Sequence, residues 1–173
     1  MVIEVICGVI WHHQHILCAR KKTGSPNAGL WELPGGKLES GESHDSCLKR
    51  ELKEELNLSV EVGPKLGLSE YKDRVKTIHL IAYHAKALST PQALSTSQAL
   101  RLLKAEPQLQ PAVSQDRTID FRLIDHDRVD WVEVWRLGSL QWAPADVPLI
   151  ERLIASNTQS PFKGSPFTES PFE

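Results

Sequence analysis

The chain has 173 residues, of which 40% are hydrophobic and 24% are charged, and this composition is typical of a single globular domain. Its formal net charge of −2 excludes a general electrostatic attraction to nucleic acids or anionic membranes, so a polyanionic ligand would have to be bound by local lysines, arginines or metal ions. No apolar run approaches the roughly 20 residues that a membrane helix needs.

The N-terminus and the cysteines predict a cytoplasmic protein. The first residues, MVIEVICGVIWHH, lack the basic segment and the small-residue cleavage site of a secretory signal. Cys7, Cys18 and Cys47 are odd in number and form no CxxC pair, which favours buried free thiols in a reducing compartment. We expect no nucleic-acid or membrane partner, and either a monomer or a homodimer.

The first part of the chain is predicted to form a β-hairpin. Residues 2–11 and 15–20 are mostly apolar, and a polar His-His-Gln turn separates them. The turn histidines are interpreted as surface residues, because nothing nearby completes a set of metal ligands. Residues 21–30 form a loop whose leading cations either are solvated or face a phosphate. Residues 31–33 are predicted to be a short strand, ended by the Pro-Gly-Gly of residues 34–36.

Residues 43–57 are predicted to form a helix that carries the most informative pattern in the chain. Leucines recur at every fourth position and form the core-facing stripe: Leu48, Leu52 and Leu56. Glu51, Glu54 and Glu55 stand at i, i+3 and i+4, so they share one face and repel one another unless a cation lies between them. Asn57 tolerates the left-handed conformation and is expected to end the helix.

The second half of the chain is predicted to contain three further strands or strand-like segments and a helix. Residues 65–71 and 76–88 alternate between apolar and polar side chains, as paired strands do. Residues 89–117 are rich in Ser, Gln, Leu and Pro, and are interpreted as a surface insertion without chemistry. Residues 125–136 contain an acidic loop and a strand, and a last helix is expected at residues 147–155.

The C-terminal segment, residues 157–173, has the composition of a low-complexity tail. The tripeptide Ser-Pro-Phe occurs three times in it, beginning at Ser160, Ser165 and Ser170. Such a segment cannot build a core, so disorder is favoured, and docking to a partner is the alternative. The sequence therefore predicts one domain over residues 1–156 followed by a disordered tail.

The stretch from Gly36 to Leu58 resembles the signature motif of the Nudix family, Gly-x5-Glu-x7-Arg-Glu-U-x-Glu-Glu-x-Gly-U, in which U is a bulky aliphatic residue. Every fixed position matches except Asn57, which stands where the family has glycine. The N-terminal hairpin and the segments WELPGG and WAPADVPLIERL are similar to the MutT-like branch, which includes 8-oxo-dGTP diphosphatases and CTP pyrophosphohydrolases. The resemblance implies an α/β (α+β) fold, namely an α/β/α sandwich with a mixed sheet and a loop–helix–loop catalytic motif.

The resemblance also implies metal-assisted substitution at phosphorus. Mg²⁺, with Mn²⁺ as the alternative, prefers oxygen ligands and would neutralise phosphate charge and acidify an attacking water. The family's metal ligands correspond here to Glu51, Glu54 and Glu55, with a backbone carbonyl from Gly35. Arg50 corresponds to an arginine that holds nearby acids in place, and Arg50, Glu51 and Glu54 form the expected catalytic set.

The remaining site residues implied by the resemblance lie outside the motif. Asp125 stands six residues before Trp131, where the MutT-like branch has a further glutamate ligand, and the alternative is a solvated acidic loop. The general base is left open between a motif glutamate and this later carboxylate. Asp146 corresponds to a base-reading position that accepts hydrogen bonds from a purine, and the alternative is an N-cap of the last helix. Trp142 either packs on the base or belongs to the core. The expected phosphate- and nucleotide-binding cations are Arg20, Lys21, Lys37, Arg74 and Lys76.

The activity that the resemblance implies is the Mg²⁺-dependent hydrolysis of a nucleoside triphosphate to the monophosphate and pyrophosphate. Oxidised nucleotides such as 8-oxo-dGTP are candidate substrates, which would give the protein a part in avoiding DNA damage. One alternative is a Nudix hydrolase acting on a sugar nucleotide, a dinucleotide or a pterin triphosphate. The other alternative is a non-catalytic, nucleotide-sensing module on the same fold.

Overall fold

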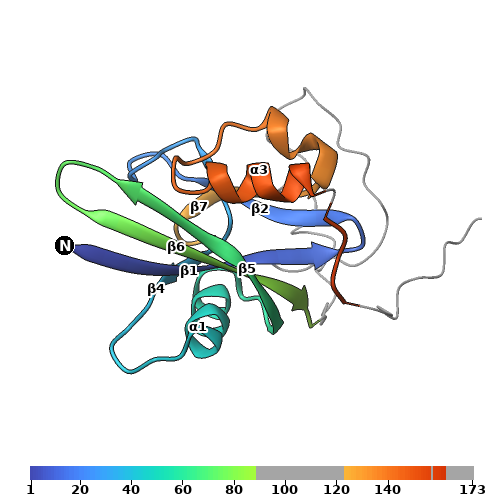
Figure 1. Ribbon diagram of the computed structural model, residues 1–173, viewed down its shortest axis with the longest axis horizontal. Coiled ribbons are helices and arrows are strands. Elements are labelled where there is room, and N and C mark those ends of the chain that lie inside the picture. The colour runs from blue at the N-terminus through green and yellow to red at the C-terminus, as the bar shows by residue number, and fades with distance from the viewer. Residues whose placement is uncertain (89–122, 157, 163–173) are drawn as a thin grey trace, which may run out of the picture.

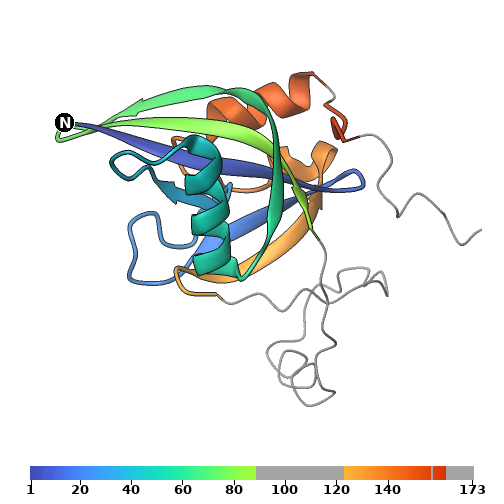
Figure 2. The ribbon, with the colours of Figure 1, turned by 90° about the horizontal axis from the view of Figure 1, so that it is seen from below.

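The computed structural model of the chain describes residues 1–88, 123–156 and 158–162 (Figure 1). A mixed β-sheet separates helix α1 (His44–Leu56) from helix α3 (Val147–Ala155) and a short 3-10 helix, η1 (Val134–Ser139). Figures 1 and 2 show α1 on one face of the sheet and α3 on the other. The predicted α/β/α sandwich is therefore confirmed.

The sheet has seven strands. Their bounds are β1 (Val2–His12), β2 (His15–Lys21), β3 (Trp31–Glu32), β4 (Gly35–Lys37), β5 (Val60–Lys72), β6 (Thr77–Ala87) and β7 (His126–Glu133). All but β4 correspond to predicted strand segments, and β5 begins earlier than predicted. The strand order is β3-β2-β1-β6-β5, while β4 pairs with β1 and β7 pairs with β2. β1 and β6 run parallel and the other pairs are antiparallel, so the sheet is mixed as expected.

β1 changes its partner along its length, and this change brings the double glycine into the sheet. The far end of β1 forms the predicted hairpin with β2, at the pair Trp11 and Ile16. Its earlier half pairs with β4, where Ile6 lies opposite Gly36. The sequence predicted that Pro-Gly-Gly would only end a strand; instead, Gly35 and Gly36 form a strand of their own. The glycine segment is thus held rigidly against β1.

Two apolar clusters fill the space on either side of the sheet. The first lies under α3 and η1 and contains Trp11, Leu149 and Leu153. The second lies under α1, and the predicted stripe of leucines, Leu48, Leu52 and Leu56, is fully buried in it. All three cysteines are buried free thiols, as predicted. Burial of these side chains removes the leucine stripe from water and fixes which face of α1 points outward.

Both ends of α1 carry the capping residues that the sequence indicates. The Ser43 side chain accepts a hydrogen bond from the backbone N–H of Ser46, which satisfies one of the free donors at the helix start. Asn57 has φ 54° and ψ 29°, the left-handed conformation, and its N–H donates to carbonyls of the last turn. Asparagine therefore performs the backbone role that glycine performs in the family motif.

The structure describes part of the tail and none of the predicted insertion. The predicted insertion at residues 89–117 lies outside the described residues. Of the tail, residues 158–162 are described, and Phe162 packs against the first apolar cluster. The expectation of a disordered tail over residues 157–173 stays a prediction, because most of that segment lies outside the described residues. Among the residues described, no helix is long and apolar enough to cross a membrane.

Candidate active site

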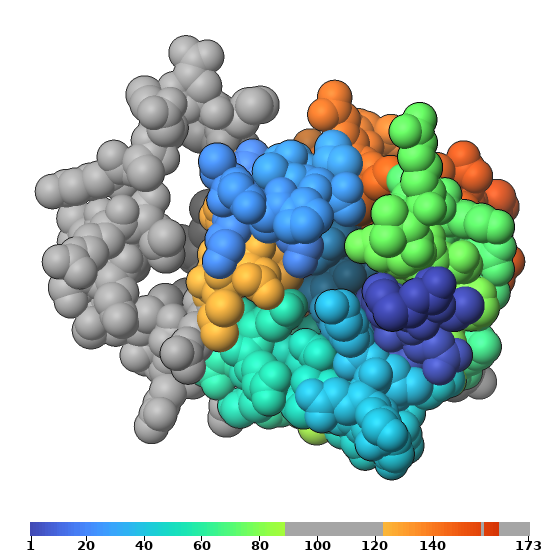
Figure 3. Space-filling model, turned by 90° about the vertical axis from the view of Figure 1, so that its left-hand side faces the viewer, coloured from blue at the N-terminus to red at the C-terminus, as the bar shows by residue number. Residues whose placement is uncertain are grey.

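A pocket of about 660 Å³ lies where β4, α1, the loop after β2 and the start of β7 meet. Figure 3 looks onto this face, which is hollowed between the blue loop, the teal helix and the orange start of β7. Its polar lining combines carboxylates, lysines and an amide: Lys21, Asn27, Glu32, Lys37, Glu39, Glu51, Glu55, Asp125 and Asp146. Its apolar lining comes from strands and from the segment before α3: Val5, Leu33, Leu38, Ile78, Leu80, Ala143 and Ala145.

Arg50 organises the acidic face of α1. Its guanidinium donates to both carboxylate oxygens of Glu42, each at 2.9 Å, and to Glu51 Oε1 at 2.9 Å. It also donates to the carbonyl of Lys37 at 3.2 Å, while its contact with Glu54 is longer, at 3.4 Å. Hydrogen bonds from Arg50 lower the pKa of Glu42. Arg50 therefore has the predicted holding role, and its main partner is Glu42 rather than Glu54 at i+4.

The two glycines of β4 leave room for the groups that face them. A Cβ at Gly36 would overlap the carboxylate of Glu51, so only glycine lets that carboxylate lie against the strand. A Cβ at Gly35 would overlap the backbone carbonyl of Ile6. Gly36 therefore makes room for a flexible side chain, whereas Gly35 makes room for fixed backbone.

Glu55 points into the pocket without a partner for its charge. Its Oε2 atom is buried and accepts no hydrogen bond within the described part of the chain. Burial raises its pKa to about 7, although the nearby His126 and Lys21 act in the opposite direction. A buried carboxylate oxygen without a partner is costly, and either a proton or a cation removes that cost.

The donors present fit a hard divalent cation. In the described ranges, no three Asp, Glu, His or Cys side chains converge closely enough to hold a metal by themselves. Mg²⁺, however, is usually bound by one or two carboxylates, and keeps waters or phosphate oxygens for its other positions. Glu51, Glu55 and the backbone of Gly35 all line the pocket, and Asp125 lies at its edge. Glu54 does not line it, and its side chain is 61% exposed.

A half-buried ion pair beside the carboxylates was not predicted from the sequence. Lys21 Nζ lies 3.0 Å from Glu32 Oε1, and the same oxygen lies 2.7 Å from Nε2 of His126. Burial by itself lowers the pKa of Lys21, but the surrounding carboxylates, Glu32 foremost, together outweigh it and raise the pKa. Lys21 therefore presents a charged ammonium to the pocket. The available signal was the alternation in Trp-Glu-Leu, which places Glu32 on the opposite face from its two apolar neighbours.

His126 and Asp125 occupy the point where β7 begins beside β2. The His126 side chain is fully buried, and its Nδ1 atom has no hydrogen-bond partner among the described groups. Asp125 lies 3.4 Å from Lys22 Nζ, and its carbonyl accepts from the Lys22 backbone at 3.2 Å. Asp125 therefore faces the pocket from the loop that the sequence indicated, while Lys22 limits how freely it can turn.

Three of the predicted substrate-binding cations do not line the pocket. Arg20 pairs with Asp127, at 2.7 Å between Nε and Oδ1. Arg74 is exposed in the turn between β5 and β6, and Lys76 follows it there. Lys21 and Lys37 are the predicted cations that the structure does bring to the pocket.

Asp146 is a buried acidic residue in the lining of the pocket. Its residue surface is 4% exposed, and its Oδ1 atom accepts a hydrogen bond from the Leu33 N–H at 2.8 Å. Asp146 is the N-cap residue of α3, as the alternative reading expected, but it caps through its backbone carbonyl, which accepts from Leu149 and Ile150, and not through its side chain. Burial, the largest cause, raises the pKa of Asp146 well above its usual range. Trp142 packs on the first apolar cluster and donates to the Leu137 carbonyl, as a core residue does.

Comparison with known proteins connects this pocket to one family. The model of the NUDIX domain matches residues 3–153. The CTP pyrophosphohydrolase of Escherichia coli K12 is 30% identical over 160 residues, which cover 92% of this chain and 97% of that protein. The 8-oxo-dGTP diphosphatase of Proteus vulgaris is 39% identical over 59 residues, which are 34% of this chain and 53% of that protein.

A solved structure shows the same arrangement of strands and helices. The solution structure of the E. coli ORF135 protein has a TM-score of 0.65 and 28% sequence identity, and the match covers 91% of each chain. The likeness therefore extends across both faces of the sheet and is not confined to the acidic helix.

The two glycines of β4 are predicted to respond differently to alanine. Gly36→Ala should fold with a Tm near that of the wild type, because the Glu51 side chain can move, but its affinity for a divalent cation should fall about 10–100-fold. Gly35→Ala should lower the Tm, because the added Cβ meets backbone. Thermal melts and Mn²⁺ titration followed by electron paramagnetic resonance measure both effects. Wild-type Mn²⁺ affinity in Gly36→Ala would contradict the role given to Glu51.

Glu55 should make the metal-free protein less stable as the pH rises. Its pKa in the folded state, about 7, exceeds the usual value, so the protonated fold gains stability at low pH and loses it as the pH passes through 7. Glu55→Gln cannot ionise and lacks this loss. With a chelator present, the variant should melt roughly a few degrees above the wild type at about pH 8, and the gap should narrow at about pH 5. A gap that widens at low pH would sink this assignment.

Proposed function

The chain belongs to the Nudix family, whose members generally use divalent metal ions, and we propose that it hydrolyses nucleoside triphosphates to the monophosphate and pyrophosphate with Mg²⁺. The observation that carries the proposal is one pocket whose lining combines carboxylates and lysines with apolar side chains. A triphosphate with an attached base likewise has a charged part and a largely apolar part.

The carboxylates and lysines of the lining are proposed to hold the metal and the phosphate chain. Glu51, Glu55 and the carbonyl of Gly35 are proposed as protein ligands, with Asp125 as an additional one. Glu54 is included because of its position on the helix, although it does not line the pocket. When bound, the metal would neutralise phosphate charge and lower the pKa of the attacking water.

The protein's own residues would orient the substrate and receive the proton. Lys21, kept charged by Glu32, and Lys37 are proposed to bind phosphate oxygens. Arg50 holds the Glu51 carboxylate toward the pocket, and Glu51 is the proposed acceptor of the water's proton. This assignment makes Arg50 a positioning residue, because its hydrogen bonds go to the acids and not to the pocket.

The apolar lining is proposed to hold the base. Leu33, Leu80 and Ala143 belong to this lining, and Asp146 is a buried polar group in the same pocket. Because burial raises the pKa of Asp146, a neutral carboxyl group is favoured there, and it offers an O–H donor in addition to an acceptor. This differs from the acceptor-only role expected from the sequence. A base with a carbonyl or ring-nitrogen acceptor on its exposed edge, such as cytosine or 8-oxoguanine, suits such a donor.

The function is tested with a panel of nucleotides and Mg²⁺, scored for pyrophosphate release. We expect turnover of at least one triphosphate from the set CTP, dCTP, dGTP and 8-oxo-dGTP. Glu54→Gln should lower kcat/KM by about 10–100-fold or more. The neighbouring Lys53 side chain points to Asn57, so Lys53→Gln should leave kcat/KM unchanged. Full activity of Glu54→Gln would remove Glu54 from the ligand set. Turnover of only sugar nucleotides, dinucleotides or pterin triphosphates would favour the alternative substrate class.

Asp146 is tested with two variants that differ in one property. Asp146→Asn keeps an acceptor for the Leu33 N–H and supplies N–H donors, so it imitates the protonated carboxyl and should retain base preference. Asp146→Ala leaves that N–H unpaired and should lower kcat/KM for the best nucleotide by about 5–150-fold, as the loss of a buried partner does. The measurement is kcat/KM for each nucleotide relative to the others. Equal losses in both variants would indicate an ionised Asp146.

A further inference from the structure

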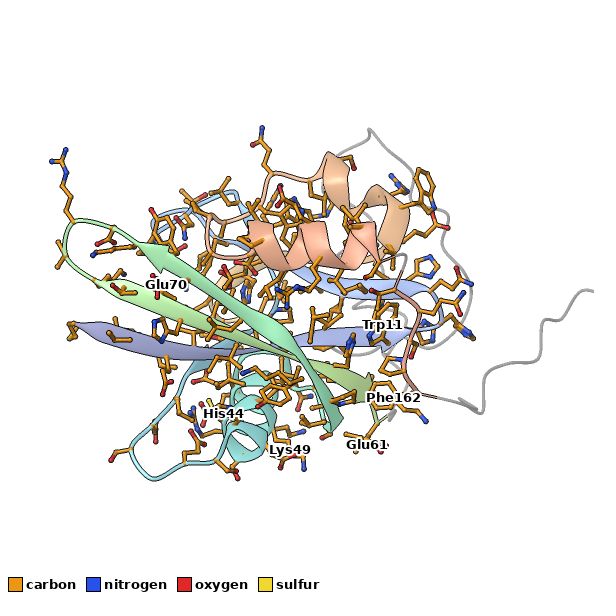
Figure 4. All side chains as sticks on the ribbon, viewed as in Figure 1. Trp11, His44, Lys49, Glu61, Glu70 and Phe162 are labelled. Atoms are coloured by element: carbon orange, nitrogen blue, oxygen red, sulfur yellow. The ribbon has the colours of Figure 1, made fainter. Side chains whose placement is uncertain are left out.

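The chain after α3 turns back onto β5, the edge strand of the sheet. The Thr158 N–H donates to the Leu153 carbonyl at 3.2 Å, and the following residues bring Phe162 against the first apolar cluster. Figure 4 shows Phe162 beside Glu61, near the start of β5, and at the same end of the molecule as Trp11. Neither Phe162 nor the strand beneath it lines the nucleotide pocket.

The docked tripeptide carries its own turn. The Ser160 Oγ atom accepts a hydrogen bond from the Phe162 N–H at 3.4 Å, and Pro161 restricts its own φ to about −65°. Pro161 is exposed, while Ser160 and Phe162 are half-buried. These contacts are local, so any Ser-Pro-Phe tripeptide can present its ring in the same way.

The ring is received at Gly63 on β5. The pairing with β6 shifts register between Val62 and Lys65, so Gly63 lies in a bulge. A Cβ at Gly63 would lie 2.7 Å from Cζ of Phe162, which is too close for real atoms. Gly63 does not adopt the left-handed conformation, so the backbone has no need of glycine there. The phenyl ring is therefore the group that a side chain at Gly63 would meet and displace.

Behind the ring, a buried pair in the neighbouring strands satisfies its own polar atoms. The Nδ1 atom of His84 accepts a hydrogen bond from the Trp11 indole N–H at 2.9 Å, and the two rings stack. Trp11 belongs to the apolar cluster against which Phe162 packs. Because the indole N–H is paired inside the fold, this part of the cluster suits an apolar ring.

We propose that the surface around Gly63 is a receptor for the Ser-Pro-Phe motif, and that the three copies of this motif in the tail compete for it. Phe162 lies seven positions after Ala155, and each later motif adds five. The entropy of closing a longer loop grows slowly, so the second and third motifs should dock only about twofold and fourfold less often than the first. One receptor is therefore served by three interchangeable segments of the same chain.

The competition is tested through the NMR shift of the Gly63 amide, which an aromatic ring above it displaces. Phe162→Ala should lower the tail's docking constant only about two- to threefold, because the other two motifs replace the first. A triple variant with Phe162, Phe167 and Phe172 all changed to alanine should lose docking. A loss already complete in Phe162→Ala would overturn the competition. An unchanged shift in the triple variant would overturn the receptor itself.

The receptor is tested by adding a peptide to the full-length triple variant. The hexapeptide Gly-Ser-Pro-Phe-Thr-Glu should restore the Gly63 shift, and Gly-Ser-Pro-Ala-Thr-Glu should not; restoration by both would overturn recognition of the ring. In the otherwise native chain, Gly63→Ala should free the tail as the triple variant does, detected by faster proteolysis of the tail. The control is Gly138→Ala, where a Cβ would meet only Ile154 at 3.5 Å. Docking that weakens on dilution would assign the motif to a second copy and overturn competition within one chain.

Discussion

The guanidinium of Arg50 is the contact on which the acidic pocket depends. It joins the Glu42 carboxylate and the Lys37 carbonyl, which precede α1, to Glu51 on the helix itself. A planar group with five donors can hold several oxygens at fixed angles, which the single ammonium of a lysine cannot do. The same contacts place a positive charge among three carboxylates, so the acidic face of α1 can fold without a metal ion to relieve its repulsion.

Glu51 and Glu55, two carboxylates of the pocket, lie in opposite electrostatic environments. Glu51 is held and compensated by Arg50, whereas Glu55 is buried without a hydrogen bond to Oε2 and has a raised pKa. Beside them, Glu32 compensates Lys21 and takes a hydrogen bond from the buried ring of His126. Some charges in the pocket are thus already paired within the fold. Glu55 differs from them, because its Oε2 atom lacks a hydrogen-bond partner among the described residues and would gain one from a proton or a bound cation.

The sequence was most informative where an element is specified locally. The leucine stripe, Ser43 and Asn57 determine where α1 begins, ends and faces, and all three were predicted. Prediction was weaker where partners are distant in the chain. The bond between Asp146 and Leu33 and the pairing of His126 with Glu32 span about a hundred residues, and no local pattern encodes them. For the same reason Arg20, whose partner is Asp127, was expected in the pocket but lies outside its lining.

The register of β7 on β2 has a consequence for how this chain can vary. Lys21 lies opposite His126 and His15 lies opposite Glu133, so the position of Asp125 is set by β2 and not by the chain that precedes it. A substitution in β2 that shifts this register by one residue would therefore move Asp125 out of the pocket, although the two segments lie about a hundred residues apart in the sequence.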